Sequence, residues 1–150
     1  NALAEAGIKQ LNLSGVALKR EEWQAMKNLK ELFRLDATNS QSAPIDIKAL
    51  TAIENLKYLD LHASPIVDDS LFDTLSTMKL QYLDLSDTKI NDKQLLKLTK
   101  MSSLVNLRLK NCPFITSEGT TQFHKFFKLL WHRDCVLETS SSGKNVAIEE

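Results

Sequence analysis

The sequence has little cysteine and no net charge. Its two cysteines, Cys112 and Cys135, are too few for the disulfide framework of a small secreted domain and form no CxxC pair. Nineteen basic residues balance nineteen acidic ones, which removes the overall basic excess typical of nucleic-acid binders. No apolar run approaches the roughly 18 residues of a membrane span. We therefore expect no nucleic-acid partner, no membrane insertion and, by default, a reducing cytoplasmic or intracellular compartment.

Residues for catalysis are also scarce. Four glycines form no phosphate-binding loop, and three histidines and two cysteines give no nucleophile, base and orienting group in a recognisable arrangement. We therefore predict a protein that is not an enzyme and has no catalytic residue, cofactor or metal. An enzyme site at His62 beside Asp60, and a metal site from His124, His132 and Cys135, are the alternatives, but a metal site needs three or four ligands at paired spacings.

A six-residue sequence motif recurs at fixed intervals along the chain. The pattern LxxLxL occurs at residues 56–61 (LKYLDL), 80–85 (LQYLDL) and 104–109 (LVNLRL), each 24 residues after the last. Earlier copies lie at residues 8–13 and, with one inserted residue, at 29–35, and a degenerate copy lies at 132–137. On this alignment the polar segment 39–44 makes the second repeat longer than the others, at about 27 residues.

Each repeat combines two periodicities. Leucine alternates with aspartate over residues 59–61, as in a short strand with one buried face, whereas Leu71, Leu75 and Met78 follow helical spacing. One strand–turn–helix unit cannot bury its apolar face alone, but five or six stacked units can. We therefore predict an α/β fold, a right-handed horseshoe-shaped solenoid with a short parallel sheet on its concave side and helices on its convex side.

This pattern resembles the leucine-rich repeat proteins over residues 3–137. The repeat length and the phrase LDLSDTKIND at 83–92 resemble the ribonuclease-inhibitor and cysteine-containing subclasses, and NCPFIT at 111–116 is similar to repeats of F-box substrate receptors. The resemblance implies a protein-binding solenoid. One turn position departs from the family: it usually holds Asn or Cys, and in this chain it holds Val16, Thr38, Ser64, Thr88 and Cys112, so a continuous Asn ladder is absent. Hydroxyl groups and the backbone must then supply the hydrogen bonds of the turns.

Short polar residues stand where the helices are expected to begin. Asp68 or Asp69 precedes one helix, Asp92 precedes the next, and Thr116 and Ser117 occupy the same place in the repeat after that. Such residues are the preferred N-caps. A cation site formed by the three aspartates is the alternative, and N-capping is the favoured interpretation.

The repeat domain is predicted to cover residues 1–137, with frames near 8, 29, 56, 80, 104 and 132. Residues 3–7 look like the end of a convex helix that stops at Gly7, so we expect the chain to be part of a longer one with flanking domains. Residues 138–150 are predicted to be a C-terminal cap or tail, in which 146–148 can add an edge strand. The aromatic residues before it either close the core or form a docking patch.

Side chains beside the central leucines of each frame should point away from the core and form three lateral rows. The first row is predicted to hold Gln10, Glu31, Tyr58, Tyr82 and Asn106. The second is predicted to hold Asn12, Phe33 or Arg34, Asp60, Asp84 and Arg108. The third is predicted to hold Ser14, Asp36, His62, Ser86 and Lys110.

The centre of this surface pairs two tyrosines with two aspartates. Tyrosine is favoured at interfaces, and the adjacent charges of Asp60 and Asp84 cost stability unless a partner or Arg108 offsets them. We therefore predict a non-catalytic recognition module that binds a protein partner carrying Lys or Arg. The predicted partner-binding residues are Tyr58, Asp60, His62, Tyr82, Asp84, Ser86, Asn106, Arg108 and Lys110. The alternative is that these side chains are simply tolerated on a solvated sheet face.

Two other functions stay open. The aromatic C-terminal region, with Phe126, Phe127 and Trp131, can instead make the chain an assembly or scaffold element, provided that these rings form an exposed patch. The irregular repeats and the family resemblance also allow a bacterial effector, secreted into a host cell, that acts on a host ubiquitin ligase or signalling protein.

Overall fold

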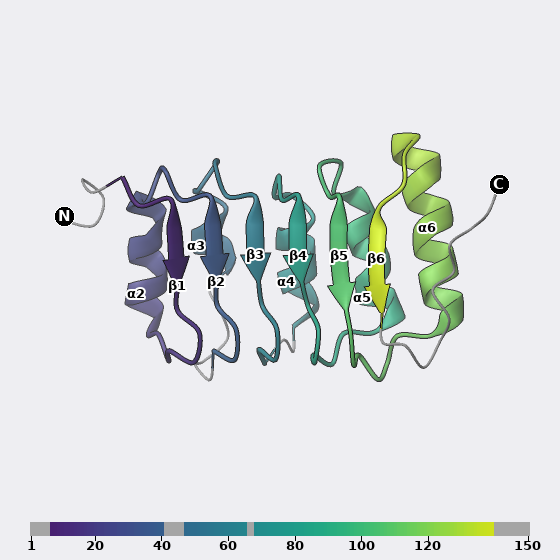
Figure 1. Cartoon of the computed structure of the whole chain (residues 1–150), viewed down its shortest axis with the longest axis horizontal. Helices are drawn as coiled ribbons and strands as arrows, with labels where there is room; N and C mark the ends of the chain where they lie inside the picture. Colours follow the sequence, from purple (N-terminus) through teal and green to yellow (C-terminus); the bar gives the residue numbers. More distant parts are fainter. Residues whose placement is uncertain (1–6, 41–46, 66–67, 140–150) are drawn as a thin grey trace.

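The computed structural model describes residues 7–40, 47–65 and 68–139 and shows a row of stacked repeats (Figure 1). Six short strands form one parallel sheet in chain order. They are β1 (Gln10–Asn12), β2 (Arg34–Asp36), β3 (Tyr58–Asp60), β4 (Tyr82–Asp84), β5 (Asn106–Leu109) and β6 (Val136–Thr139). The chain is thus an α/β solenoid, as the repeated phrase predicts.

Helices alternate with the strands; in Figure 1 the middle ones lie behind the sheet, and the first and the last lie at its two ends. The α-helices are α2 (Arg20–Ala25), α3 (Ile47–Leu50), α4 (Asp69–Leu75), α5 (Asp92–Lys97) and α6 (Ser117–Trp131). Two 3-10 turns, η1 (Met26–Asn28) and η2 (Leu98–Lys100), extend α2 and α5. No described element crosses the opposite face of the sheet, which we call the concave face.

The strand register corrects the predicted second repeat. Leu35 lies opposite Leu59, and Leu11 opposite Leu35, so the second frame begins at Leu32 and not at residue 29. The repeat length is therefore constant from the first frame to the fifth, and neither the inserted residue nor the longer second repeat exists. Ala37 takes the place of the third leucine of the frame and is fully buried, which concealed the frame in the sequence.

The sixth frame is also displaced. Leu107 pairs with Leu137, so the frame runs over residues 134–139 and not 132–137. The sixth strand is confirmed, and it ends at Thr139, two residues beyond the predicted end of the repeat domain. Most of the predicted C-terminal segment, including residues 146–148, lies outside the described residues, as do residues 3–6 of the predicted first helix end.

The core is a stack of leucines between sheet and helices. Leu35, Leu59, Leu83 and Leu107, one from each of four successive strands, have no exposed side-chain surface. Burying each side chain contributes roughly 1.5–3 kcal/mol. Leu11, the equivalent residue of the first strand, is only half-buried because no described element covers the outer side of β1.

The turn after each strand repeats one backbone conformation. Gly15, Asn39, Ala63, Asp87 and Asn111 occupy the same position of successive repeats, and all have φ between +50° and +70°. This left-handed conformation is free of strain only for glycine and is tolerated best by Asn and Asp among other residues. Ala63 is the one residue of this set that is not Gly, Asn or Asp.

Three of the residues that follow these turn positions, Ser40, Ser64 and Thr88, supply the expected hydroxyl groups, with one correction. Ser40, not Thr38, precedes Ser64 in the ladder, and their hydroxyl oxygens are 3.4 Å apart. The Ser64 hydroxyl donates to the Ala37 carbonyl at 2.9 Å, and the Thr88 hydroxyl donates to the Leu85 carbonyl at 2.6 Å. Hydroxyl groups thus donate hydrogen bonds to carbonyls of the turns, as predicted from the absence of an Asn ladder.

The helix starts confirm two of the predicted caps and correct one. Asp68 accepts from the Ser70 amide, and Thr116 accepts from the Gly119 amide, both at 3.0 Å. The α5 helix is capped by Asn91 in a capping box with Gln94 and not by Asp92. Asp92 instead accepts from the amide and the hydroxyl of Thr116, at 2.9 and 2.6 Å, and so ties one helix start to the next.

The last helix closes the C-terminal end of the core. Phe123 and Phe127 are buried against the last repeat, and their rings stack 5.5 Å apart. The Trp131 indole donates to the Thr99 carbonyl at 2.7 Å, and the Arg133 guanidinium lies 5.3 Å from the centre of the Phe127 ring. The capping role predicted for the aromatic residues is confirmed for Phe123 and Phe127.

Candidate protein-binding surface

Parallel pairing sorts the concave face into rows of equivalent residues. The first row holds Gln10, Arg34, Tyr58, Tyr82, Asn106 and Val136. The second row holds Asn12, Asp36, Asp60, Asp84, Arg108 and Glu138. Two residues further on, the same repeat spacing places Thr38, His62, Ser86 and Lys110 in line.

Every error in the predicted rows lies in the second or the last repeat. Arg34 replaces Glu31 in the first row, Asp36 replaces Phe33 or Arg34 in the second, and Thr38 replaces Asp36 in the third. Glu138 was missed altogether because the last frame was displaced. A constant repeat length, counted back from Leu56 to Leu32, is the signal that finds the correct second frame.

Three aromatic side chains make a continuous strip on this face. The Tyr58 and Tyr82 rings stack with centroids 5.8 Å apart, and the Phe33 ring lies 5.0 Å from that of Tyr58 at an angle of 51°. Phe33 is 42% exposed and the two tyrosines are half-buried. We call Phe33, Tyr58 and Tyr82 the aromatic strip. Phe33 was predicted in another row, so its contact with the tyrosines was not foreseen.

The acidic row has a structural role in addition to its charge. Asp36, Asp60 and Asp84 each accept a hydrogen bond through Oδ1 from the amide two residues later, at 2.9 to 3.0 Å. These bonds hold the turns that end the strands. Burial raises the pKa of Asp60, and the neighbouring charges of Asp84 and Asp36 raise it further against the effect of the His62 amide. The ionised form of Asp60, at the centre of the row, is therefore disfavoured by burial and by its acidic neighbours.

A hydrogen-bonded network occupies the C-terminal part of the concave face. The Arg108 guanidinium donates through Nη1 to the Tyr82 hydroxyl at 3.2 Å and through Nε to Glu138 Oε2 at 2.9 Å. Tyr82 in turn donates to Asp84 Oδ2 at 3.3 Å. Asp84 lies 3.5 Å from Arg108 Nη1 and is only 4% exposed as a residue. The charge of Asp84 is thus compensated within the chain.

Asn106 and Lys110 join the same network through Glu138. Asn106 Nδ2 donates to Glu138 Oε1 at 3.0 Å, and Lys110 Nζ lies 3.8 Å from Oε2. The hydrogen bond from Asn106 is the main cause of the lowered pKa of Glu138, with Arg108 and Lys110 contributing. We call Tyr82, Asp84, Asn106, Arg108, Lys110 and Glu138 the Arg108 network.

The third row has its own internal contacts. His62 Nδ1 lies 3.4 Å from Asp87 Oδ2 and does not pair with Asp60. The Ser86 hydroxyl is buried and accepts from the Lys110 amide at 3.0 Å. Lys110 is exposed. His62 and Lys110 can therefore meet a partner, whereas Ser86 has its place in the turn.

The described residues hold no assembled chemistry of the kinds considered above. No group of three His, Cys, Asp or Glu among residues 7–40, 47–65 and 68–139 stands close enough to hold a metal ion. His124 Nδ1 is 3.0 Å from the Thr120 carbonyl of its own helix. Burial raises the pKa of the Cys135 thiol to about 12, so this buried sulfur stays protonated and is a poor nucleophile.

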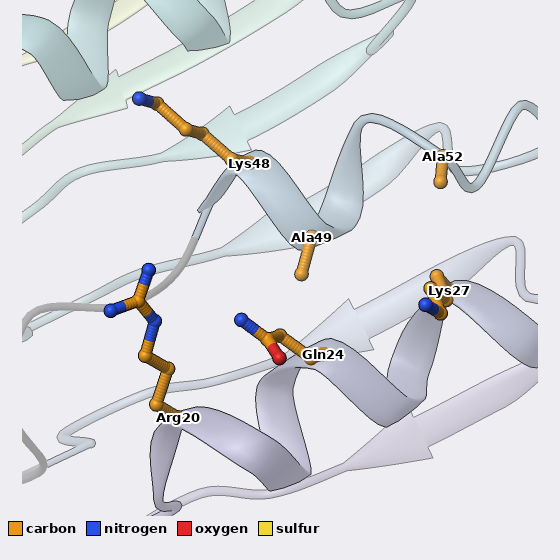
Figure 2. A pocket seen from close by; sticks show the side chains of 6 residues that line it. All are labelled: Arg20, Gln24, Lys27, Lys48, Ala49 and Ala52. Carbon is orange, nitrogen blue, oxygen red and sulfur yellow. The ribbon is translucent and has the colours of Figure 1, made fainter.

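A pocket opens on the helical side, between α2 and α3 (Figure 2). Its lining residues are Arg20, Gln24, Lys27, Lys48, Ala49 and Ala52. In Figure 2 the Lys48 side chain extends away from α2, so its charge does not converge with those of Arg20 and Lys27 on one point. The lining contains no acid, thiol or hydroxyl group, and we assign no chemistry to this pocket.

The outer side of α6 exposes a second apolar group of side chains. Phe126, Leu129 and Leu130 are 43%, 66% and 51% exposed, and their spacing places them on one face of the helix. Of the three rings proposed for an aromatic patch, Phe127 is buried, Trp131 is half-buried and only Phe126 is exposed. Phe127 therefore belongs to the cap of the core, whereas Phe126 is available at the surface.

The stacked repeat units, the parallel sheet and the bare strand face define a leucine-rich repeat solenoid. Among solved structures, the chain is similar to an internalin from Listeria monocytogenes, with 18% identity and a TM-score of 0.48 over 91% of this chain and 48% of that chain. It is also similar to an internalin C2 from the same organism, with 16% identity and a TM-score of 0.40 over 89% of this chain and 81% of that one. The chain thus spans about half the length of the first of these proteins.

No protein-family model matches the sequence, and no curated protein matches it either. Within the part of the chain that the structure describes, no helix has the length and apolar character needed to cross a membrane.

Proposed function

We propose that the chain is a protein-recognition module that binds its partner through the concave face. The observation that carries the proposal is the aromatic strip, in which the Tyr58 ring contacts both Phe33 and Tyr82 on a sheet face that no described element covers. Aromatic side chains are enriched at the centres of protein interfaces because they bury a large area and lose little conformational entropy. A solvated face without a partner has no need of such a strip.

The division of the concave face supports the same function. The Arg108 network holds charged side chains of β4, β5 and β6 in fixed positions, and a rigid surface loses less entropy on binding. Phe33 and Tyr58 lie on the side of Tyr82 that faces away from Arg108. They have exposed ring surface and no hydrogen bond with a described side chain. We therefore place the centre of the binding surface at Phe33 and Tyr58, with Tyr82 at its boundary.

Affinity capture with a double variant tests this function. Phe33→Ala with Tyr58→Ala removes the exposed part of the strip and leaves the Arg108 network intact. The matched control, Phe126→Ala with Leu129→Ala, removes exposed apolar surface from α6. After thermal unfolding has shown that all three chains fold alike, we expect a protein that wild type and the α6 variant retain and the strip variant loses. Retention by all three rejects the concave face.

A second candidate function rests on the exposed face of α6. Phe126, Leu129 and Leu130 form an apolar surface that a neighbouring domain or copy can cover, as an assembly element requires. The same capture distinguishes the two, because loss of a bound protein in the α6 variant alone assigns function to this helix. Identification of the retained protein also tests the host ubiquitin-ligase or signalling partner of the effector alternative.

A further inference from the structure

We propose that the concave face binds an extended segment of a partner protein through an arginine or lysine side chain, with its stem across Phe33 and Tyr58 and its charge at Asp36 and Asp60. This inference rests on the proposed function and specifies the chemistry of the partner. It also moves the cation-binding position from the pair Asp60 and Asp84, which the sequence alone favours, to the pair Asp36 and Asp60.

Asp36 and Asp60 are the carboxylates that lack a compensating charge. They are paired residues of neighbouring strands, and both are half-buried. Their Oδ1 atoms accept from the amides of Thr38 and His62, but among the described residues neither carboxylate forms an ion pair. Like charges directly opposite each other on a sheet are destabilising. Burial is the main cause of the raised pKa of Asp60, and the charges of Asp84 and Asp36 add to it, which is consistent with this repulsion.

The other charged groups of this face are already engaged or do not reach the pair. Arg108 contacts Asp84 and Glu138, and His62 contacts Asp87. Arg34 lies in the first row on the same strand as Asp36, and no ion pair joins the two in the described part of the chain. A cation from outside can therefore approach half-buried carboxylates without an ion pair at Asp36 and Asp60, whereas Asp84 is nearly inaccessible.

The rings and the carboxylates are placed for one long cationic side chain. Tyr58 and Asp60 point to the same face two residues apart, which is roughly 7 Å along a strand. Arginine and lysine have an apolar stem that packs on rings and a charged end that reaches beyond them. The tilted Phe33 and Tyr58 rings offer a surface for the stem and for a cation–π contact, and the two carboxylates accept from the charged end. An acidic segment is repelled at the same place.

Selection from a random peptide library displayed on phage tests the partner chemistry directly. The bait is the wild-type chain or a variant with Asp36→Asn and Asp60→Asn, which keeps an acceptor oxygen for each turn. The charge-matched control is Asp69→Asn with Asp73→Asn on α4, because both of these carboxylates are bound to lysines of α5. We expect wild type and control to enrich peptides with Arg or Lys at a common position. The Asp36/Asp60 variant should lose this enrichment.

Binding of one selected peptide then gives the size of the effect. Loss of charge-assisted hydrogen bonds should raise the dissociation constant of the peptide about tenfold or more in the Asp36/Asp60 variant. The α4 control should bind the peptide as tightly as wild type. In a pH titration followed by NMR, the peptide should lower the pKa of Asp60, because a nearby cation favours the ionised form. An unchanged Asp60 titration contradicts the inference.

The failures of the two proposals are distinguishable. If the selected peptides lose binding to the Phe33→Ala, Tyr58→Ala variant but show no basic enrichment, the cation site is wrong and the concave binding face stands. The same holds if they bind the Asp36/Asp60 variant as tightly as wild type. If no peptide is selected, or if peptides bind equally without Phe33 and Tyr58, both proposals fail. Phe33→Ala alone, at an exposed position, replaces the double variant if the latter unfolds.

Discussion

Arg108 and Tyr82 are joined across neighbouring strands by a hydrogen bond of 3.2 Å, in which the guanidinium donates to the phenol oxygen. This bond is the main cause of the raised pKa of Arg108. Burial raises the pKa of Tyr82, and its hydroxyl donates its own proton to Asp84. The sequence alone allows Arg108 either to bind a partner or to offset the aspartates. In the structure it binds within the chain and compensates the buried carboxylate of Asp84.

Arg108→Met should destabilise the fold by about 1–2 kcal/mol, because it leaves the nearly buried Asp84 with only its hydrogen bonds to Tyr82 and the Ser86 amide. The cost stays below that of a fully buried charged pair, because the Arg108 side chain is 34% exposed. Urea denaturation gives the difference. Lys93→Met, which breaks the exposed contact with Asp69, is the control and should leave stability unchanged. Equal midpoints for the two variants contradict the structural role of Arg108.

Asp60→Asn and Glu138→Gln should change the pH dependence of stability in opposite directions. The raised pKa of Asp60 means that protonation stabilises the fold. This contribution is complete below the unfolded value of about 3.8 and is lost as the pH rises through the folded pKa. Asp60→Asn should therefore stabilise the chain at neutral pH by about 0.5 kcal/mol, the scale of a cross-strand charge pair. The gain should vanish in acid.

Glu138 has the opposite sign because its pKa is lowered. Its contribution is present above the unfolded value of about 4.5 and is lost as the pH falls through the folded pKa. Glu138→Gln should thus destabilise the chain at neutral pH and have little effect in strong acid. Thermal unfolding of both variants from acid to neutral pH measures the two slopes. Slopes of the same sign are incompatible with the described network.

Ala63→Gly should raise stability by about 0.5–1 kcal/mol, because glycine freely adopts a conformation that costs an L-residue energy. Ala63 has φ of +53°. Ala25→Gly, at the exposed end of α2 where φ is −66°, is the matched control and should lower stability by up to about 1 kcal/mol. Denaturation midpoints of the two variants should move in opposite directions, and a loss of stability in both refutes the turn geometry.

Two adjacent residues of α6 should respond differently to truncation. Phe127→Ala should cost roughly 3–5 kcal/mol, because the ring is buried in the end of the core and packs on Phe123. Phe126→Ala should change stability by less than about 0.5 kcal/mol, since the residue is 43% exposed and is not one of the buried core residues. Chemical denaturation of both variants compares them. A large cost at Phe126 means that this face is covered in solution.

Much of the fold follows from periodicity alone. Alternation at Leu59 and Leu83 marks strands, and the constant repeat spacing marks their stacking, so the parallel sheet is predictable from the sequence. The second frame was misplaced because Ala37 substitutes for a leucine while Leu29 mimics the first frame position. Alanine is small enough to be buried there, but it carries little hydrophobic signal in a pattern search.

The concave face was predictable in part. Tyr58, Tyr82, Asp60 and Asp84 occupy the rows expected of them, because their two frames are regular and share one phrase. Arg34 and Asp36 were assigned to the second and third rows instead of the first and second, because their frame was wrong. The sequence offered Arg108 as a charge that could offset Asp84, and the structure joins the two. The contact of Arg108 with Glu138 could not be predicted, since Glu138 is 30 residues away and belongs to a strand with a degenerate motif.

Local spacing and the burial of leucine are enough to specify the repeat, the strand–helix alternation and the order of the sheet, and all three can be read along the chain. Which charges are free depends instead on contacts between strands. Asp60 and Asp84 have identical local sequences, Tyr-Leu-Asp-Leu, yet Asp84 meets Arg108 on the next strand and Asp60 does not. Whether an ion pair forms depends on the distance between charged atoms that folding brings together. The residues next to Asp60 or Asp84 in the sequence do not determine that distance.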